Sequence, residues 1–215
     1  MSYSKKIDQY LVLVTATLFI VAFIGALIFL GSSKPQDFDL IDQPTLGNFE
    51  SKVEMVVFED LMCDDCKHFM LNIFPSIQEK YIKTNLISFK MIPIAFLPYS
   101  KEVTTVALCL YKQNKKLYWS FVQNWYTNIP TYKVDASLTS LLNALPVVDK
   151  TELASCRASD AIAAKLKTNL HIAEMLLTPQ ISVPSILING KRVPLSSIEN
   201  ISKEIDLALS ESNKP

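Results

Sequence analysis

Hydrophobic residues dominate the start of the chain. No residue from Leu11 to Leu30 is charged, and an α-helix of these twenty residues would be about 30 Å long, which matches the hydrocarbon core of a membrane. The pattern predicts a transmembrane helix, which we place at residues 11–31. A cleaved signal peptide is an alternative, although its apolar region is usually only about 7 to 15 residues long. A buried core helix is the other, although this segment is hydrophobic on all faces.

The charges beside this segment predict its orientation. Lys5 and Lys6 precede it and Lys34 follows it, so the excess of positive charge places residues 1–10 in the cytoplasm. We therefore expect a single-pass protein of the cytoplasmic (inner) membrane, with its folded domain on the periplasmic, extracytoplasmic side. A signal peptide would also export the domain, so the membrane anchor and the signal peptide both predict an oxidising compartment.

Alternating and continuous apolar runs then predict a globular domain. Residues 32–48 have the composition of an exposed linker, and the folded part is expected to begin near Thr45. The run Val53–Glu59 predicts a buried strand, and Leu86–Ile94 a second one. Helical spacing of apolar residues connects them from Cys63 to Tyr81, with Pro75 as a kink. Strand, helix, strand indicates a parallel pair.

The segment from residue 98 to 177 shows no strand-like alternation. Three or four helical patterns, separated by Pro130 and Pro146, predict a helical block. Its aromatic residues are most simply the core of that block; they are Tyr111, Tyr118, Trp119, Phe121, Trp125 and Tyr126.

The last part of the chain predicts a hairpin and a helix. Ser185–Val193 reads as two short strands joined at Asn189 and Gly190, residues that tolerate the positive backbone angles of a tight turn. Ser196 or Ser197 can cap a final amphipathic helix. The apolar positions of this helix are Ile198, Ile201, Ile205, Leu207 and Leu209.

Composition limits the function classes. The 215 residues are 49% hydrophobic, enough for a membrane segment and one domain with a real core. The formal net charge is zero and no run of five or more Lys and Arg occurs, so nucleic acid is not expected as a partner.

One short sequence carries obvious chemistry. Cys63 and Cys66 form a Cys-x-x-Cys motif between a predicted strand and helix. Unpaired N–H groups at the helix start stabilise a thiolate on the first cysteine, and the second, one turn on, is close enough to attack it. Half of a zinc site and inert thiols are the alternatives. Zinc needs further ligands, and Cys109, Cys156, His68 and His171 show no second close pair, so we expect neither a metal nor a cofactor.

These residues resemble a known family, the DsbA-like branch of the thioredoxin-like oxidoreductases. The resemblance rests on Val57–Cys66 and Val183–Lys191 and covers about residues 45–210. It implies an α/β thioredoxin-like fold with an inserted helical domain, preceded here by the transmembrane helix. The thioredoxin-like domain would comprise residues 49–97 and 178–215, and the inserted domain residues 98–177.

The resemblance also implies a partner loop for the cysteines. Val183 and Pro184 look like the cis-proline loop, whose backbone would lie against the sulfur of Cys63 and pair with a substrate chain. From the residues alone a trans bond is expected, because only about 5 to 6% of X-Pro bonds are cis.

Asp64 and Asp65 depart from the family pattern, which usually has neutral or basic residues between the cysteines. A nearby carboxylate disfavours a thiolate, so both should oppose the helix-start effect on Cys63, with Lys67 offsetting part of it. A less stable thiolate predicts a milder oxidant than the most oxidising members of the family.

A buried acid often lies six residues before the first cysteine in thioredoxin-like proteins, but that residue here is Val57. Glu59 and Asp60 lie nearer. Asp60 matches an aspartate common in the family and is a candidate proton relay for Cys66; a capping or solvated acid is the alternative.

Cys109 and Cys156 remain in the helical block. In an exported protein, two leftover cysteines more often pair than stay free, and some DsbA-like proteins have a second disulfide there. Two buried thiols that act as small apolar residues are the alternative.

Together these features predict an enzyme that introduces disulfide bonds into reduced or misfolded exported proteins. A membrane quinone-linked oxidase would reoxidise it. One alternative is a reductase or isomerase of the same fold, kept reduced by a membrane thiol carrier. Another is a tethered chaperone without enzymatic activity.

Overall fold

The computed structural model describes residues 15, 17, 42–128, 134–145 and 147–212. The strands are β1 (Thr45–Gly47), β2 (Glu54–Asp60), β3 (Ser88–Ile94), β4 (Ser185–Ile188) and β5 (Lys191–Val193). The helices are α2 (Asp64–His68), α3 (Phe74–Ile77), α4 (Ser100–Gln113), α5 (Lys115–Thr127), α6 (Val134–Ala144), α7 (Lys150–Arg157), α8 (Asp160–Leu176) and α9 (Ile198–Ser212). Two π-helical segments, η1 (Phe69–Ile73) and η2 (Gln78–Ile82), flank α3.

A mixed sheet forms the centre of the fold. Among the described residues it has five strands in the order β1-β3-β2-β4-β5, with β2 and β3 parallel and the other pairs antiparallel. Val57 in β2 lies opposite Met91 in β3 and Ile186 in β4, and all three side chains are fully buried. The predicted parallel pair is therefore confirmed, and its continuous apolar runs reflect burial on both faces of the sheet.

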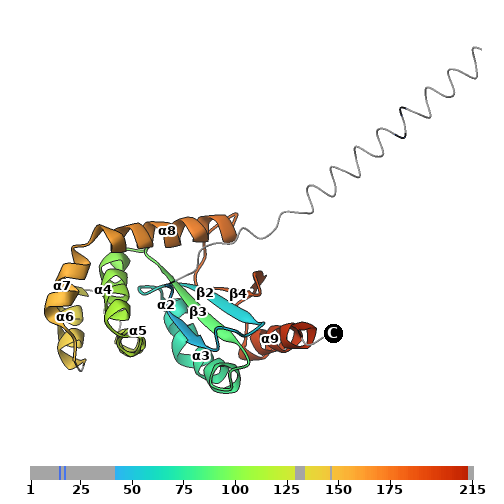
Figure 1. The fold of residues 1–215 in the computed structure, drawn as a ribbon, viewed down its shortest axis with the longest axis horizontal. Coiled ribbons are helices and arrows are strands. Elements are labelled where there is room, and N and C mark those ends of the chain that lie inside the picture. The colour runs from blue at the N-terminus through green and yellow to red at the C-terminus, as the bar shows by residue number, and fades with distance from the viewer. Residues whose placement is uncertain (1–14, 16, 18–41, 129–133, 146, 213–215) are drawn as a thin grey trace, which may run out of the picture. The chain divides into compact units, whose positions relative to one another are not determined.

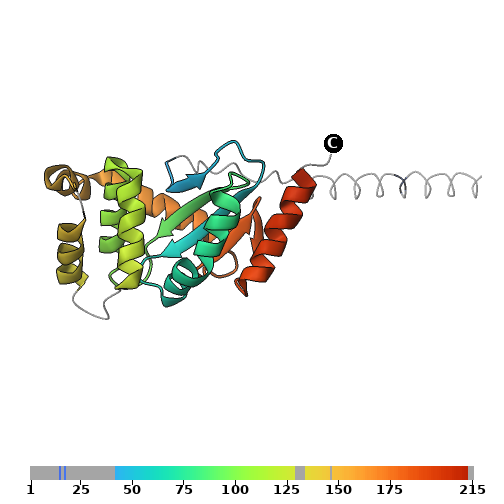
Figure 2. The same cartoon turned by 90° about the horizontal axis from the view of Figure 1, so that it is seen from below.

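Helices cover the two faces of the sheet and one of its ends. Figures 1 and 2 show α8 on one face, the helix that contains α2 and α3 together with α9 on the other, and α4 to α7 beyond one end. This is the thioredoxin-like arrangement with a helical insertion that the resemblance implied. The described residues from 42 onward form one compact unit.

Helix α8 links the helical part to the sheet. The side-chain amide of Asn169 donates a hydrogen bond to the carbonyl oxygen of Pro93 in β3 at 2.8 Å, and it accepts one from Gln43 at 2.7 Å. The predicted inserted domain, residues 98–177, thus includes a helix that also packs on the sheet.

Strand β1 (Thr45–Gly47) lies inside the predicted linker, which extended to residue 48 and was therefore too long, whereas the expected start of the folded part near Thr45 is confirmed. Thr45, Leu46 and Gly47 pair antiparallel with β3, and the N–H of Met91 donates to the carbonyl oxygen of Pro44 at 2.8 Å. Gly47 has a φ of 82°, and a Cβ there would lie 2.5 Å from the carbonyl oxygen of Ile87. Partner strand β3 orders this three-residue segment, whose own composition is that of a loop.

The helix after Cys63 forms as predicted and changes its hydrogen bonding before Pro75. The N–H of Phe74 donates to the carbonyl of Phe69, five residues earlier. Pro75 then occupies the first turn of α3, where its missing N–H is not needed.

The helical block contains more helices than the three or four predicted. Its described residues form five, α4 to α8, and Pro130 and Pro146 lie outside the described residues. The prediction that the aromatic residues form its core is confirmed for four of them, which are at most 1% exposed: Tyr118, Phe121, Trp125 and Tyr126. Tyr111 and Trp119 pack against that core and are partly buried.

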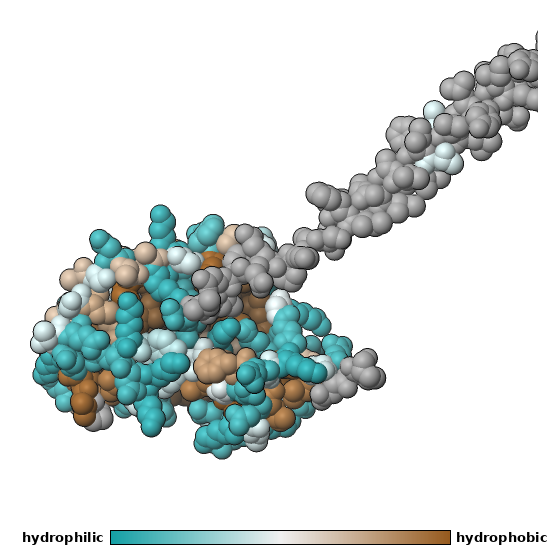
Figure 3. Space-filling view, in the orientation of Figure 1, coloured by the Kyte–Doolittle hydropathy of each residue, from teal (hydrophilic) through white to brown (hydrophobic). Residues whose placement is uncertain are grey.

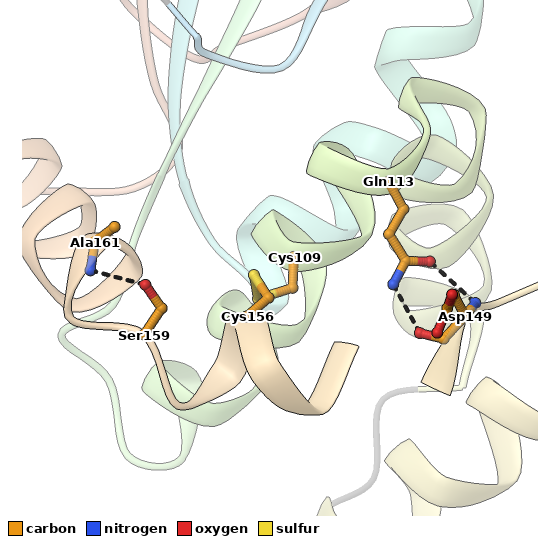
Figure 4. Close-up of a disulfide and its surroundings, with 6 residues drawn as sticks. All are labelled: Cys109, Gln113, Asp149, Cys156, Ser159 and Ala161. Atoms are coloured by element: carbon orange, nitrogen blue, oxygen red, sulfur yellow. Dashed lines mark hydrogen bonds between the residues drawn. A yellow bond between two sulfur atoms is a disulfide. The ribbon is translucent and has the colours of Figure 1, made fainter. Parts of the chain in front are cut away.

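A disulfide joins Cys109 of α4 to Cys156 of α7, which confirms the predicted pairing (Figure 4). The side chain of Gln113, one turn further along α4, adds two hydrogen bonds to the backbone of Asp149. Its amide nitrogen donates to the carbonyl oxygen at 2.9 Å, and its amide oxygen accepts from the N–H at 3.2 Å. The disulfide thus joins α4 to α7, and the side-chain amide of Gln113 joins α4 to Asp149, which precedes α7.

The C-terminal hairpin and helix also form as predicted, with one correction. Asn189 and Gly190 form the turn with φ values of 47° and 77°. Ser197 accepts a hydrogen bond from the N–H of Asn200 at 3.3 Å at the start of α9. Leu207 was expected on the buried face, but it is 46% exposed because α9 turns this position towards solvent.

The surface shown in Figure 3 is largely hydrophilic, with hydrophobic side chains exposed between the polar ones. No helix of the described residues is long and apolar enough to span a membrane. The transmembrane helix predicted at residues 11–31 lies outside the described residues, apart from Thr15 and Thr17, and stays a prediction.

Candidate functional site

Cys63 and Cys66 lie together where β2 leads into α2. Cys63 is the N-cap residue of α2, and its sulfur accepts a hydrogen bond from the N–H of Cys66 at 3.3 Å. The N–H of Cys63 donates to the carbonyl oxygen of Asp60 at 3.0 Å, which closes the turn between strand and helix. A thiol therefore replaces the usual capping hydroxyl or carboxylate, and it points at N–H groups that favour a negative charge.

The thiol of Cys63 is the more acidic of the two. Its pKa lies below the ordinary value, chiefly because the Cys66 thiol donates a hydrogen bond to it, and further because the backbone N–H groups of Cys66 and Asp65 do so. Partial burial and the negative charge of Asp65 act in the opposite direction. Cys63 is 8% exposed, whereas Cys66 has no exposed surface.

Cys66 has the opposite character. It is completely buried, and burial is the main reason why its pKa is raised far above that of an ordinary thiol. The hydrogen bond to Cys63 and the negative charge of Glu59 raise this pKa further. Both cysteines are free thiols in this structure. Because their pKa values are shifted in opposite directions, Cys63 favours the thiolate and Cys66 favours the protonated form.

The loop that contains Val183 and Pro184 lies against Cys63. The Cys63 thiol is 3.5 Å from the carbonyl oxygen of Val183, and the bond between Val183 and Pro184 is cis. The cis bond and the position of the loop beside Cys63, which the resemblance implied, are thus confirmed, and the trans bond expected from the residues alone is wrong. Pairing of this loop with a substrate chain stays a prediction. The chain brings these residues together from 120 positions apart.

Asp64 and Asp65 are exposed residues in the first turn of α2. The predicted effect is confirmed for Asp65, whose charge raises the pKa of Cys63, although its N–H acts the other way. The main causes of the shift in the pKa of Cys63 include neither Asp64 nor Lys67.

Asp60 is completely buried, so it is not a solvated acid. One carboxylate oxygen accepts a hydrogen bond from the N–H of Met62 at 2.9 Å, and the other accepts from Phe96 and Leu97 at 3.0 Å each. These bonds tie the segment before Cys63 to the loop after β3. Its predicted role as a proton relay stays a prediction.

Glu59 is the buried acid that the sequence reasoning passed over. Its carboxyl is fully buried, which raises its pKa well above the usual range; a hydrogen bond from the hydroxyl of Tyr126 at 3.0 Å partly opposes this, and the charge of Cys63 adds to it. Oε1 of Glu59 has no hydrogen-bond partner among the described residues. Side chains alternate along a strand, so Glu59 shares a face with the buried Val57, a signal present in the sequence.

Helix α5 holds this acid and the turn after it. Trp125 donates from its ring nitrogen to the carbonyl oxygen of Leu61 at 2.8 Å, and the next residue, Tyr126, binds Glu59. The helical insertion is therefore in direct contact with the end of β2 from which the cysteines follow.

Within the part of the chain that the structure describes, no group of three or more His, Cys, Asp and Glu residues is placed to hold a metal ion. Cys109 and Cys156, two of the ligands that a zinc site would have needed, are bonded to each other.

Comparisons with known proteins agree with this chemistry. A family model described as "Thioredoxin" matches residues 39–207. A putative protein-disulfide oxidoreductase of Rickettsia prowazekii is 29% identical over 178 residues, which cover 79% of this chain and 62% of that protein. A probable disulfide bond formation protein D of Bacillus cereus is 25% identical over 173 residues, covering 78% and 79%. The chain thus spans less than two thirds of the rickettsial protein.

Solved structures share the fold. DsbA of Chlamydia trachomatis superposes with a TM-score of 0.72 and 20% identity, covering 80% of this chain and 94% of that one. Oxidised BdbD of Bacillus subtilis gives a TM-score of 0.70 and 21% identity, covering 79% and 94%.

Proposed function

Because the chain belongs to the thioredoxin family, on its DsbA-like branch, we propose that it introduces disulfide bonds into exported proteins through Cys63 and Cys66. The observation that carries the proposal is the asymmetry of this pair. Cys63 has a lowered pKa and lies beside the half-buried Val183, whereas Cys66 has a raised pKa and is fully buried.

In the oxidised protein, a substrate thiolate attacks the sulfur of Cys63. The Cys63–Cys66 bond breaks, a mixed disulfide forms between substrate and Cys63, and Cys66 leaves with the electron pair. A second thiolate of the same substrate then attacks the substrate sulfur of the mixed disulfide. Cys63 leaves as a thiolate, and the substrate keeps the new disulfide while the enzyme has gained two electrons.

The two pKa values suit these two steps. Cys63 is the leaving group of the second step, and a thiol with a lower pKa leaves faster. Cys66 takes up a proton when it is released, because its thiolate is disfavoured by burial.

Glu59 suits the proton exchange with Cys66 better than Asp60 does. Both carboxylate oxygens of Asp60 are bound to backbone N–H groups, whereas Oε1 of Glu59 has no partner among the described residues. The charge of Glu59 also acts directly on the thiol of Cys66. Burial raises the pKa of Glu59, which favours its protonated form, so this carboxyl is suited to hold a proton for exchange with Cys66.

The substrates would be reduced or partly unfolded exported proteins. Val183 can pair with the backbone of an extended substrate segment beside Cys63. Reoxidation needs an external electron acceptor, for which a membrane quinone-linked oxidase is the natural class. The protein itself would be held at the extracytoplasmic face of the cytoplasmic membrane by residues 11–31.

A stoichiometric oxidation assay tests the proposal. The oxidised full-length chain is mixed with a reduced, unfolded protein that has two cysteines. The products are alkylated, and the loss of free thiols from the substrate protein alone is followed by its mass. Cys63→Ser should abolish this loss. The control, in which Cys109 and Cys156 are both replaced by Ala, should keep it, because that disulfide lies between α4 and α7. Equal activity of the Cys63→Ser variant would contradict the proposal.

The redox state in cells decides the direction of electron flow. Acid quenching and alkylation should find Cys63 and Cys66 bonded to each other if the protein is an oxidase. A reduced pair would instead support the reductase or isomerase. If the protein is a chaperone without redox activity, the Cys63→Ser variant should prevent the aggregation of an unfolded protein as well as the wild type does.

A further inference from the structure

The loop between α8 and β4 contains the Val183 backbone that faces Cys63. It extends from Leu177, the C-cap residue of α8, to Ser185, the first residue of β4. Ser182 in this loop is exposed and Val183 is half-buried. The loop nevertheless brings the carbonyl oxygen of Val183 to 3.5 Å from the sulfur of Cys63, so something must hold it there.

Arg192 of β5 binds this loop at three points. One terminal nitrogen of its guanidinium group donates to the hydroxyl of Ser182 at 2.7 Å and to that of Ser185 at 3.2 Å. The other terminal nitrogen donates to the carbonyl oxygen of Leu177 at 3.5 Å. A planar group with several fixed donors suits three acceptors that belong to different parts of one loop.

Ser182 and Ser185 flank Val183 and Pro184 in the sequence. Ser182 directly precedes Val183, and Ser185 directly follows Pro184. The hydroxyl of Ser185 also donates to the carbonyl oxygen of Ser182 at 2.6 Å, so a hydrogen bond links the residues on either side of Val183 and Pro184.

The position of Arg192 is itself fixed by the sheet. It lies opposite Leu187 in the antiparallel pair of β4 and β5, and the tight turn at Asn189 and Gly190 sets this register. The guanidinium group therefore has a rigid base from which to hold the loop.

We propose that Arg192 is a positioning residue of the thiol-exchange site, which holds the Val183 carbonyl beside Cys63 and so sets the binding of polypeptide substrates. The proposal rests on the proposed function. Arg192 acts through Ser182 and Ser185 and is not itself a reacting group. A small thiol needs only the sulfur of Cys63, whereas an extended polypeptide also needs the backbone of Val183.

This difference provides the test. We would compare the full-length wild type with Arg192→Ala, Arg192→Lys and Ser182→Ala in two reactions of the oxidised protein. One is the oxidation of a peptide with two cysteines, measured as kcat and KM with oxidised glutathione present in excess to regenerate the Cys63–Cys66 disulfide. The other is reduction by dithiothreitol. The control is Arg157→Ala, which removes an arginine of α7 that forms an ion pair with Glu102 of α4.

Arg192→Ala should raise KM for the peptide by about tenfold and leave the rate with dithiothreitol within about twofold of the wild type. The reason is that a displaced Val183 weakens peptide binding but leaves the sulfur of Cys63 as reactive as before. Ser182→Ala should show the same split to a smaller extent. Arg192→Lys should recover part of the loss, because an ammonium group keeps the charge but not the fork. Arg157→Ala should change neither reaction.

The proposal is overturned if Arg192→Ala leaves the peptide KM unchanged, if it slows both reactions equally, or if Arg157→Ala gives the same split. Thermal unfolding of each variant checks the fold. If Arg192→Ala does not fold, Ser182→Ala and Arg192→Lys take its place as the test. A wild type that cannot oxidise the peptide would overturn the proposed function and this inference with it. An active wild type with no split in the variants would overturn the inference alone.

Discussion

The hydroxyl of Tyr126 donates a hydrogen bond to Oε2 of Glu59 at 3.0 Å, and neither side chain has any exposed surface. Tyr126 belongs to the helical insertion, and Glu59 belongs to the strand that ends at the cysteines. The pair therefore joins the insertion to the electrostatics of Cys66, whose pKa the charge of Glu59 raises.

Glu59→Gln should remove a pH dependence of stability. The folded pKa of Glu59 is raised above the usual value of about 4.3, so the folded state binds more protons than the unfolded state above that pH. The stability from the neutral acid is fully present below about pH 4.3 and is lost as pH rises through the folded pKa, by up to about 1.4 kcal/mol per pH unit.

Urea unfolding of the oxidised protein at several pH values between 5 and 8 measures this effect, because bonded cysteines do not titrate. The Glu59→Gln variant should gain stability over the wild type as pH rises. Glu50→Gln, at an exposed position before β2, leaves Glu59 intact and should keep the loss. Parallel curves for the wild type and Glu59→Gln would refute the assignment.

Tyr126→Phe should destabilise the protein by about 1 to 3 kcal/mol, because it leaves the carboxyl of Glu59 without a hydrogen bond from the described residues. That bond lowers the pKa of Glu59, so its removal should also shift the pH-dependent loss of stability to higher pH. Tyr111→Phe is the matched control, since its hydroxyl binds the carbonyl oxygen of Gln43 at 3.0 Å, away from Glu59. It should lower stability without moving the pH profile; an equal shift in both variants would contradict the prediction.

The sequence predicted those parts of the fold that depend on local patterns. The parallel pair and the hairpin followed from continuous apolar runs and from Asn189 and Gly190. Strand β1 was missed because three residues, one of them a glycine, carry no periodic signal, and pairing with β3 alone makes them a strand.

The cysteine pair was predictable, but its surroundings were not. The motif marks Cys63 and Cys66, whereas the contacts of Glu59 with Tyr126 and of Ser182 with Arg192 depend on how distant segments pack. Asp60 attracted the proton-relay hypothesis because of its family position, yet its three hydrogen bonds to backbone N–H groups appear only in three dimensions.

Asp65→Asn should lower the pKa of Cys63, because the charge of Asp65 raises it. The absorbance of the thiolate near 240 nm, followed against pH in the reduced protein, measures the shift. A more stable thiolate also makes the protein more oxidising, by about 30 mV for each 1.4 kcal/mol. Asp64→Asn is the neighbouring control and should have the smaller effect; a larger effect at Asp64 would show that the described geometry does not govern this thiol.

The disulfide between Cys109 and Cys156 should contribute more to stability than to thiol exchange. It closes a loop with a sequence separation of 47, for which the chain-entropy model gives a stabilisation of about 4 kcal/mol. Replacing both cysteines by Ala should therefore lower the free energy of unfolding in urea by roughly that amount. Gln113→Ala removes the hydrogen bonds to Asp149 between the same elements (Figure 4) and should cost only about 1 to 2 kcal/mol. A double variant that loses less stability than Gln113→Ala would mean that α4 and α7 are held together by packing, and that the covalent link adds little.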